Sequence, residues 1–223
     1  MAEAVLVLAS NSPRRKELLR LSGWEFEVRP ADVDESQLPG ETASEYVLRL
    51  AESKARQAAR RFPEKALILA ADTTVVVDGD VLGKPRSSAH AVEMLRRLRG
   101  RTHQVMTGLA ALRQGAPERM VTDLCVTQVP MRPYREEEIT AYVASRDPLD
   151  KAGAYAIQNP AFHPVEGLGG CYASVMGLPL CHVVRSLRSL GVEPPSDVPA
   201  RCQEALHYHC PISAGVLRGE RLG

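Results

Sequence analysis

The sequence predicts an α/β protein built on a mixed, twisted sheet with flanking helices. Residues 5–8 form an apolar strand, which leads through a polar turn into a helix that begins at Pro13. Residues 66–71 are a continuous apolar run, which is typical of a central strand covered on both faces. Residues 103–112 and 120–131 indicate two longer, antiparallel strands. Helices between these segments would cover the sheet, as in other α/β proteins.

Length and composition are those of an ordinary globular protein. The chain has 223 residues, enough for one domain or one domain with a tail, and 25% of them are charged. The net charge of +1 argues against a protein that binds nucleic acid or a membrane over a broad surface. The five cysteines are irregularly spaced, and the N-terminal segment does not resemble a signal peptide. We therefore expect a reduced, cytoplasmic protein with no nucleic-acid or membrane partner.

The first helix carries an unusual charge at its start. Ser12 is a natural N-cap, and Pro13 suits the first helical position, where its missing N–H is not needed. Three cations follow at positions 14–16, although the N-terminus of a helix is the positive end of its dipole and favours acids. Backbone N–H groups, the hydroxyls of Ser10 and Ser12 and two arginines would together bind a polyphosphate. The alternative is a solvated basic helix start, but the strand–turn–helix context favours the anion site.

An acidic loop follows a short strand. Residues 24–28 alternate like a strand, and residues 29–40 form a polar loop that contains Asp32, Asp34 and Glu35. Three acids on a loop are usually solvated, but they also suit a hard cation.

The second helix is expected to run from Thr42, which forms a capping box with Glu45, to about Arg61. Lys54 falls in the middle of its apolar stripe. Two interpretations are open at this stage, because a lysine there either extends its stem along apolar surface or points into an internal polar site.

The central strand is followed by two candidate functional residues. Asp72 comes directly after the apolar run, and ligands of open α/β sheets bind outside the carboxyl ends of strands. Residues 75–82 are typical of a hairpin with a type I′ turn at Asp78-Gly79. Lys84 follows between a glycine and a proline, which permit close backbone approach and stiffen the turn. The structural alternative is that Lys84 simply pairs with Asp72.

The remaining elements follow from caps and apolar periods. They are a helix over 87–99 with a solvated arginine face, a short acidic helix over 134–145, a loop over 159–170, a strand over 171–176 and a final helix over 178–190. Small residues over 150–158 let a backbone lie close to a ligand, and Gln158 offers an amide for base recognition.

The composition shifts beyond residue 190. We expect residues 1–190 to form the domain and residues 191–223 a tail, because prolines interrupt any long element there. Four cysteine and histidine residues, which can bind metals, cluster in the tail: Cys202, His207, His209 and Cys210. A zinc site is conceivable, but the usual spacings are absent, so a capping tail or a frayed terminus is favoured.

A series of motifs occurs in order along residues 5–190. They are LASNSPRRKELL from Leu8, Glu35 after the acidic loop, AESKA around Lys54, AADTTV around Asp72, LGKPR around Lys84, HQVMTG from His103, and DKAGAYAIQ ending at Gln158. Together they resemble the Maf-type nucleotide pyrophosphatases, most closely the dTTP/UTP branch. No glycine-rich Walker or Rossmann pattern competes with this resemblance.

The resemblance implies a fold with two lobes around a deep central cleft, similar to that of inosine triphosphatases, and a homodimer. It also implies that a nucleoside triphosphate is hydrolysed to the monophosphate and pyrophosphate with the help of Mg²⁺ or Mn²⁺. The implied substrates are dTTP and UTP, or a broader or modified set of nucleotides. Such an enzyme would have a house-cleaning role in nucleotide pools.

The resemblance further implies roles for individual residues. Asp72 falls on the proton acceptor, with Lys54 and Lys84 as further catalytic residues. The implied phosphate-binding set is Ser10, Arg14, Arg15, Lys54 and Lys84. The specificity positions are Arg14, Thr73 and Gln158, and the tentative metal ligands are Glu35 and Asp72.

Two other functions stay open. A non-catalytic nucleotide-binding regulator, for example of cell division, would use the same cleft and release no pyrophosphate. A nucleic-acid-binding protein would use the arginines over 96–101 and bind with a steep salt dependence. The near-neutral net charge and the lack of nearby aromatic residues argue against the second function.

Overall fold

The computed structural model of the protein describes residues 5–62 and 66–222. The elements follow one another as β1 (Leu6–Leu8), α1 (Pro13–Arg20), β2 (Phe26–Val28), α2 (Ala43–Ala59), β3 (Leu67–Val77), β4 (Asp80–Leu82), α3 (Ser88–Leu98), β5 (Thr102–Arg113), β6 (Arg119–Pro130), α4 (Glu136–Ala144), the 3₁₀ turns η1 (Asp147–Asp150) and η2 (Ala152–Ala154), α5 (Tyr172–Met176), α6 (Leu180–Ser189), α7 (Val198–Leu206) and α8 (Ser213–Leu217).

The sheet has six strands, and the predicted mixed α/β class is confirmed. The strand order is β2-β1-β3-β5-β6, with β4 paired to β3 as well. β1 pairs with β2 and with β3 in parallel, whereas β3, β5 and β6 form an antiparallel set and β4 folds back on β3. β3, β5 and β6 are the longest strands, with 11 or 12 residues each.

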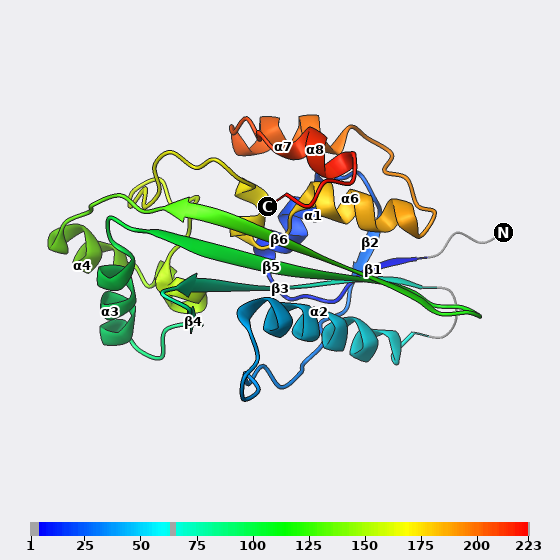
Figure 1. Ribbon diagram of the computed structural model, residues 1–223, viewed down its shortest axis with the longest axis horizontal. Coiled ribbons are helices and arrows are strands. Elements are labelled where there is room, and N and C mark those ends of the chain that lie inside the picture. The colour runs from blue at the N-terminus through cyan, green and yellow to red at the C-terminus, as the bar shows by residue number, and fades with distance from the viewer. Residues whose placement is uncertain (1–4, 63–65, 223) are drawn as a thin grey trace.

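Helices cover both faces of the sheet and one end of it. α2 lies on one face, and α1 and α6–α8 lie on the other, while α3 and α4 gather at the far end of the long strands (Figure 1). α2 packs closely, since a Cβ added at Gly108 would come within 2.6 Å of the Val47 carbonyl oxygen. The core is aliphatic on both faces: Ile68 and Ala70 face α2, and Leu67 and Leu69 face the other layer.

Several local predictions are confirmed. The Ser12 side chain caps α1 by accepting a hydrogen bond from the Arg15 N–H at 3.4 Å. Thr42 and Glu45 form the capping box of α2. Asp78 and Gly79 take φ values of 55° and 84°, as a type I′ turn between paired Val77 and Asp80 requires.

β3 is longer than the predicted strand, and the predicted placement of Asp72 at its carboxyl end is wrong. The strand continues to Val77, and Asp72 pairs with Gly108 in the middle of the β3–β5 ladder. Thr73 and Thr74 are β-branched and suit the pleated backbone, so nothing local ends the strand after the apolar run.

The predicted strand over 171–176 is also wrong, because this segment forms α5. The Cys171 sulfur accepts a hydrogen bond from the Ser174 N–H at 3.3 Å, and Gly177 ends the helix with a φ of 110°. A cap at each end therefore determines the conformation of this short apolar segment.

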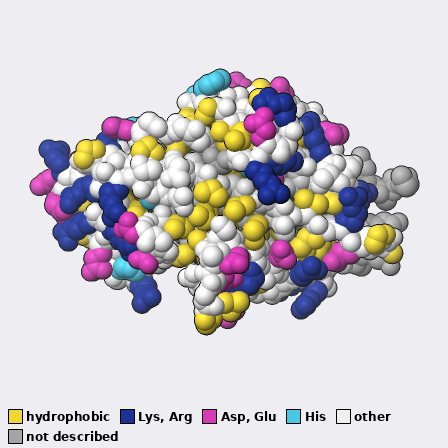
Figure 2. All heavy atoms as spheres, in the orientation of Figure 1, with side chains coloured by type: hydrophobic (Ala, Val, Ile, Leu, Met, Phe, Trp, Pro, Cys, Tyr) yellow, Lys and Arg dark blue, Asp and Glu magenta, His cyan; other side chains and the backbone are white. Residues whose placement is uncertain are grey.

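The predicted arginine face, which lies at the end of α3 and just after it, is neutralised by carboxylates within the protein. Its members pair with carboxylates of neighbouring elements: Arg96 and Arg99 with Glu136, Arg97 with Asp78 and Asp80, and Arg101 with Asp78. Figure 2 shows basic and acidic side chains intermixed at this end of the molecule. A surface of alternating sign offers no continuous track for a phosphate backbone.

The tail packs on the domain. α7 and α8 lie against α6, and Val198 and Val216 are buried. Over residues 5–62 and 66–222, no three side chains of metal-binding type converge, so the zinc alternative finds no support. None of the helices described is long and apolar enough to cross a membrane.

Candidate active site

A gap in the pairing of β3 creates the main cavity. On one edge of β3, β1 pairs with residues 67–69 and β4 pairs with residues 75–77. In the described chain no strand pairs with residues 70–74 on that edge. A cavity of about 560 Å³ opens there, lined by residues from the turn after β1 and from α1, α2, β3 and the 150–158 segment. Because strand side chains alternate, Asp72 and Thr73 enter this cavity region from opposite faces of the sheet.

On the α2 face, a buried lysine joins two carboxylates. The Lys54 ammonium donates hydrogen bonds to Asp72 Oδ1 and to Glu35 Oε1, each at 2.6 Å. Lys54 and Asp72 are each only 8% exposed. Of the two interpretations of a lysine in the apolar stripe, the structure therefore supports the one in which Lys54 points into an internal polar site.

The acidic loop reaches this pair through Glu35. The Tyr46 hydroxyl of α2 donates to the Glu35 carbonyl at 2.8 Å and holds the loop over the cavity. Partial burial raises the pKa of Glu35, but the hydrogen bond and charge of Lys54, helped by Lys84 and Arg15, outweigh it, so the net pKa is lowered. Glu35 is thus kept ionised beside the cavity.

On the other face, Arg15 is held by a fixed set of acceptors. Its guanidinium donates to the Gly177 carbonyl at 2.8 Å, to Thr73 Oγ1 at 3.2 Å and to Ser10 Oγ at 3.4 Å. Thr73 Oγ1 also lies 2.9 Å from Thr107 Oγ1. Burial lowers the pKa of Arg15, and the charge of Asp72 opposes that shift. Arg15 is positioned before any ligand binds.

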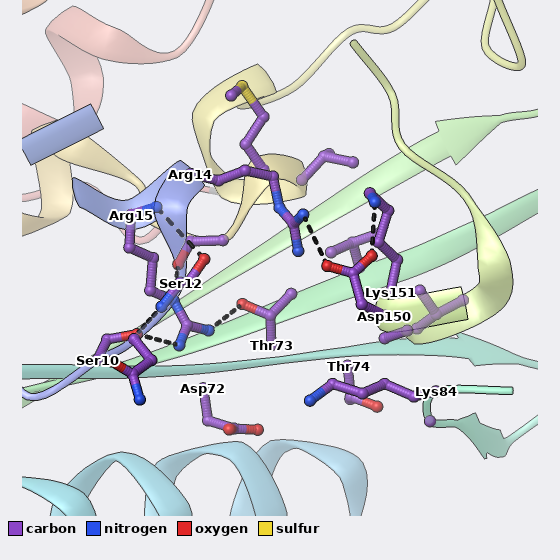
Figure 3. A pocket seen from close by; sticks show the side chains of 18 of the residues that line it. Ser10, Ser12, Arg14, Arg15, Asp72, Thr73, Thr74, Lys84, Asp150 and Lys151 are labelled. Carbon is purple, nitrogen blue, oxygen red and sulfur yellow. Dashed lines mark hydrogen bonds and ion pairs between the residues drawn. The ribbon is translucent and has the colours of Figure 1, made fainter. Parts of the chain in front are cut away.

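The rim of the cavity carries an ion pair that joins α1 to the 150–158 segment. Arg14 lies 3.8 Å from Asp150, which also accepts a hydrogen bond from Lys151 at 2.6 Å. Figure 3 shows Arg14 and Asp150 across the cavity from Asp72, with Lys84 extending toward the Asp72 side. Across the described ranges Lys84 has no ion-pair partner, so it does not form the alternative pair with Asp72. Gln158 is exposed and lines the same cavity.

All the predicted site residues line this one cavity. They are Ser10, Arg14, Arg15, Glu35, Lys54, Asp72, Thr73, Lys84 and Gln158. The sequence prediction missed the Arg14–Asp150–Lys151 pairs, although Asp150 and Lys151 begin the DKAGAY motif. It also missed Thr107, which has no local signal because a threonine within a strand is ordinary.

This arrangement suits a multiply charged anion. Arg14, Arg15 and Lys84 face the cavity as cations, and Lys54 lies behind them between two carboxylates. A guanidinium binds phosphate oxygens in a fork, and a lysine acts as a point charge. A buried carboxylate next to such an anion site is placed to bind a cation or a water molecule.

Comparison with known proteins agrees with this geometry. A family model described as Maf-like protein matches residues 5–190. A dTTP/UTP pyrophosphatase of Geobacter metallireducens is 48% identical over 186 residues, which cover 83% of this chain and 96% of that protein. A dTTP/UTP pyrophosphatase of Methylococcus capsulatus is 48% identical over 187 residues, covering 84% and 91% of the two chains. A solved HAM1 protein from Coxiella burnetii aligns with a TM-score of 0.42 and 18% identity over 70% of this chain and 88% of that one, too distant a likeness to support an argument. The predicted family is confirmed, and the chain belongs to the Maf-like proteins.

Proposed function

We propose that the protein hydrolyses nucleoside triphosphates between the α- and β-phosphates and releases pyrophosphate. The observation that carries this proposal is the gap at residues 70–74 of β3, where Asp72 meets a cavity faced by Arg14, Arg15 and Lys84. The names of the relatives, which are dTTP/UTP pyrophosphatases, support the same reaction.

The cations would bind the triphosphate. Arg15 is already oriented by Gly177 and Thr73, so little conformational entropy is lost when it binds a phosphate. Arg14 would exchange its exposed Asp150 partner for the substrate. Lys84 supplies a third cation, and Ser10 a hydroxyl, to the same cavity.

Asp72 would act on the attacking water. Its buried carboxylate is oriented by Lys54 and is placed to accept a proton or to hold the water in line with the phosphorus. Lys54 would also bind the phosphate tail as it exchanges part of its contact with the carboxylates. General-base roles of this kind contribute about 10²–10⁴-fold in rate.

The donor set fits a divalent cation such as Mg²⁺ or Mn²⁺. Lys54 contacts one oxygen of Asp72 and one of Glu35, so the two carboxylates lie on either side of its ammonium, and both line the cavity. Mg²⁺ is usually bound by one or two carboxylates together with substrate phosphates. Asp72 and Glu35 would hold the ion, which would neutralise charge on the phosphate oxygens.

The base preference we propose is thymine or uracil. The relatives are named for dTTP and UTP, and this chain has arginine, threonine and glutamine at its specificity positions. The amide of Gln158 has no hydrogen-bond partner within the described residues and can donate to and accept from a pyrimidine edge. The homodimer and the cytoplasmic location stay predictions from the sequence.

Replacing the central carboxylate tests the proposal. We expect Asp72→Asn to lower pyrophosphate release from dTTP with Mg²⁺ by about 10³-fold, because the amide cannot accept the proton. Calorimetry should still detect dTTP binding, since the arginines are unchanged. The control Asp80→Asn removes an exposed acid from neighbouring β4 and should keep full activity. If the wild-type protein with Mg²⁺ or Mn²⁺ binds nucleotides but releases no pyrophosphate from any of them, the regulator alternative replaces the enzyme.

A further inference from the structure

The tail brings a cysteine from beyond the family match to the start of α5. The Tyr208 hydroxyl donates to the carbonyls of Leu168 at 3.0 Å and Gly170 at 2.8 Å, just before Cys171. The Cys210 N–H donates to the Gln203 side chain at 2.9 Å, which fixes the segment after α7. The family match ends at residue 190, so this contact lies outside the shared domain.

Four of the five cysteines line one small cavity under the tail. Cys171, Cys181, Cys202 and Cys210 surround a space of about 20 Å³. All five cysteines are free thiols, and Cys125 of β6 lies beside the group. Cys171 and Cys210 lie on this cavity together, because Tyr208, two residues before Cys210, is hydrogen-bonded to the carbonyl of Gly170, the residue before Cys171.

The thiols differ in exposure and in acidity. The pKa of Cys210 is lowered to about 6 against partial burial. The neighbouring Cys171 thiol is the main cause, and the N–H groups of Ile212 and Ser213 add to it. Cys210 is also partly exposed. Burial raises the pKa of Cys202 to about 11.

The other thiols are poorer nucleophiles. The pKa of Cys125 is lowered by its hydrogen bond with Cys171, but its side chain is fully buried on β6. The pKa of Cys171 is raised by its hydrogen bonds to Cys125 and Cys210 and by burial. A partly exposed thiolate beside a second, buried thiol is the usual arrangement of a redox-sensitive pair.

We propose that Cys210 is a modification site for hydroperoxides and that Cys171 resolves the product into a disulfide. The Cys210 thiolate attacks the peroxide, an S–O bond forms, the O–O bond breaks, and the leaving oxygen takes a proton to become water. The Cys171 sulfur then attacks the Cys210 sulfenic acid, an S–S bond forms, and hydroxide leaves as water with the Cys171 proton. Two thiols and one H₂O₂ give one disulfide and two waters, so the peroxide is the two-electron oxidant.

The disulfide would attach the tail to the element that positions Arg15. Cys171 is the N-cap of α5, and Gly177 at the other end of α5 accepts the Arg15 hydrogen bond. The oxidised tail would therefore be linked covalently to one wall of the active-site cavity. This proposal concerns a second site and does not depend on the proposed hydrolysis.

Peptide mapping of the wild-type protein tests the site directly. The purified full chain is treated with a small excess of H₂O₂, digested without reduction and analysed by mass spectrometry. We expect two of the five thiols to be lost and a linked peptide pair containing Cys171 and Cys210. A disulfide between any other pair, or five free thiols after treatment, would overturn the proposal.

Three variants separate the two roles. In Cys171→Ser, we expect a sulfenic acid on Cys210 that a dimedone probe traps, and no disulfide. In Cys210→Ser, the protein should keep all four remaining thiols. The matched control Cys202→Ser removes a thiol from the same cavity and should form the disulfide at the wild-type rate. In the wild-type protein, iodoacetamide should modify Cys210 about tenfold faster than Cys202 at neutral pH, and equal rates would contradict the assigned nucleophile.

Discussion

The inner end of the cavity and its rim use the same residue types in opposite ways. Inside, Lys54 and Asp72 are each 8% exposed and lie 2.6 Å apart. At the rim, the side chains of Arg14 and Asp150 are 24% and 68% exposed, and their charged atoms are 3.8 Å apart. Removing one partner of the inner pair leaves a buried charge that water cannot solvate, which is strongly destabilising. Removing one partner of the rim pair leaves a charge that water can solvate, which costs little stability. We therefore expect the inner pair to control folding and chemistry and the rim pair to control access of the ligand.

The largest effect should come from removing the inner cation. Lys54→Met leaves the buried carboxylate of Asp72 without its partner, and we expect the unfolding free energy to fall by about 3–5 kcal/mol in a urea titration. Pyrophosphate release should be lost with it.

A double variant sharpens this prediction. Lys54→Met combined with Asp72→Leu removes both buried charges, and we expect it to recover most of the stability while activity stays lost. If Lys54→Met were as stable as the wild type, the inner pair would contribute as little to the unfolding free energy as the rim pair.

An intermediate effect is expected for Glu35, whose side chain is 51% exposed. Its pKa in the folded protein lies below the ordinary value of 4.5, so its stabilising contribution is fully present above pH 4.5 and is lost as the pH falls through the lower folded-state value. Glu35→Gln should flatten the decline in unfolding free energy below pH 4.5. Asp32→Asn, an exposed acid of the same loop, should leave that decline unchanged.

The smallest effect on stability should come from the rim. Asp150→Asn releases Arg14 and removes a negative charge from the mouth of the cavity, so we expect a change of about 1 kcal/mol or less in unfolding free energy and a KM for dTTP about threefold lower. Steady-state assays at low and high salt provide the measurement, because screening should reduce the gain. Glu17→Gln removes an exposed acid from α1 outside the cavity and serves as the control. A raised KM in Asp150→Asn would mean that Asp150 assists binding rather than competing with the substrate.

Local features were predictable because their causes lie within a few residues. The Ser12 cap, the Thr42–Glu45 capping box and the Asp78-Gly79 turn all depend on neighbouring positions. The wrong predictions concern elements whose conformation depends on a contact with a distant segment or on an uncommon capping residue. The sequence predicts a strand end at Asp72 because the pairing of β3 with β5 is not evident from the residues of β3 alone. It predicts a strand at α5 because a cysteine is an uncommon helix cap.

The sequence by itself determined the family, the α/β class and the set of charged residues that line the cavity, since these follow from motifs and residue types. Only the tertiary structure decided that Lys54 pairs with Asp72 and Glu35, that Arg14 pairs with Asp150, and that Cys210 of the tail lines the same small cavity as Cys171. Each of these contacts joins segments that are far apart in the chain. Their formation depends on how β1 and β4 leave part of the β3 edge open and on how the tail packs against α6, and no local pattern of residues specifies such packing.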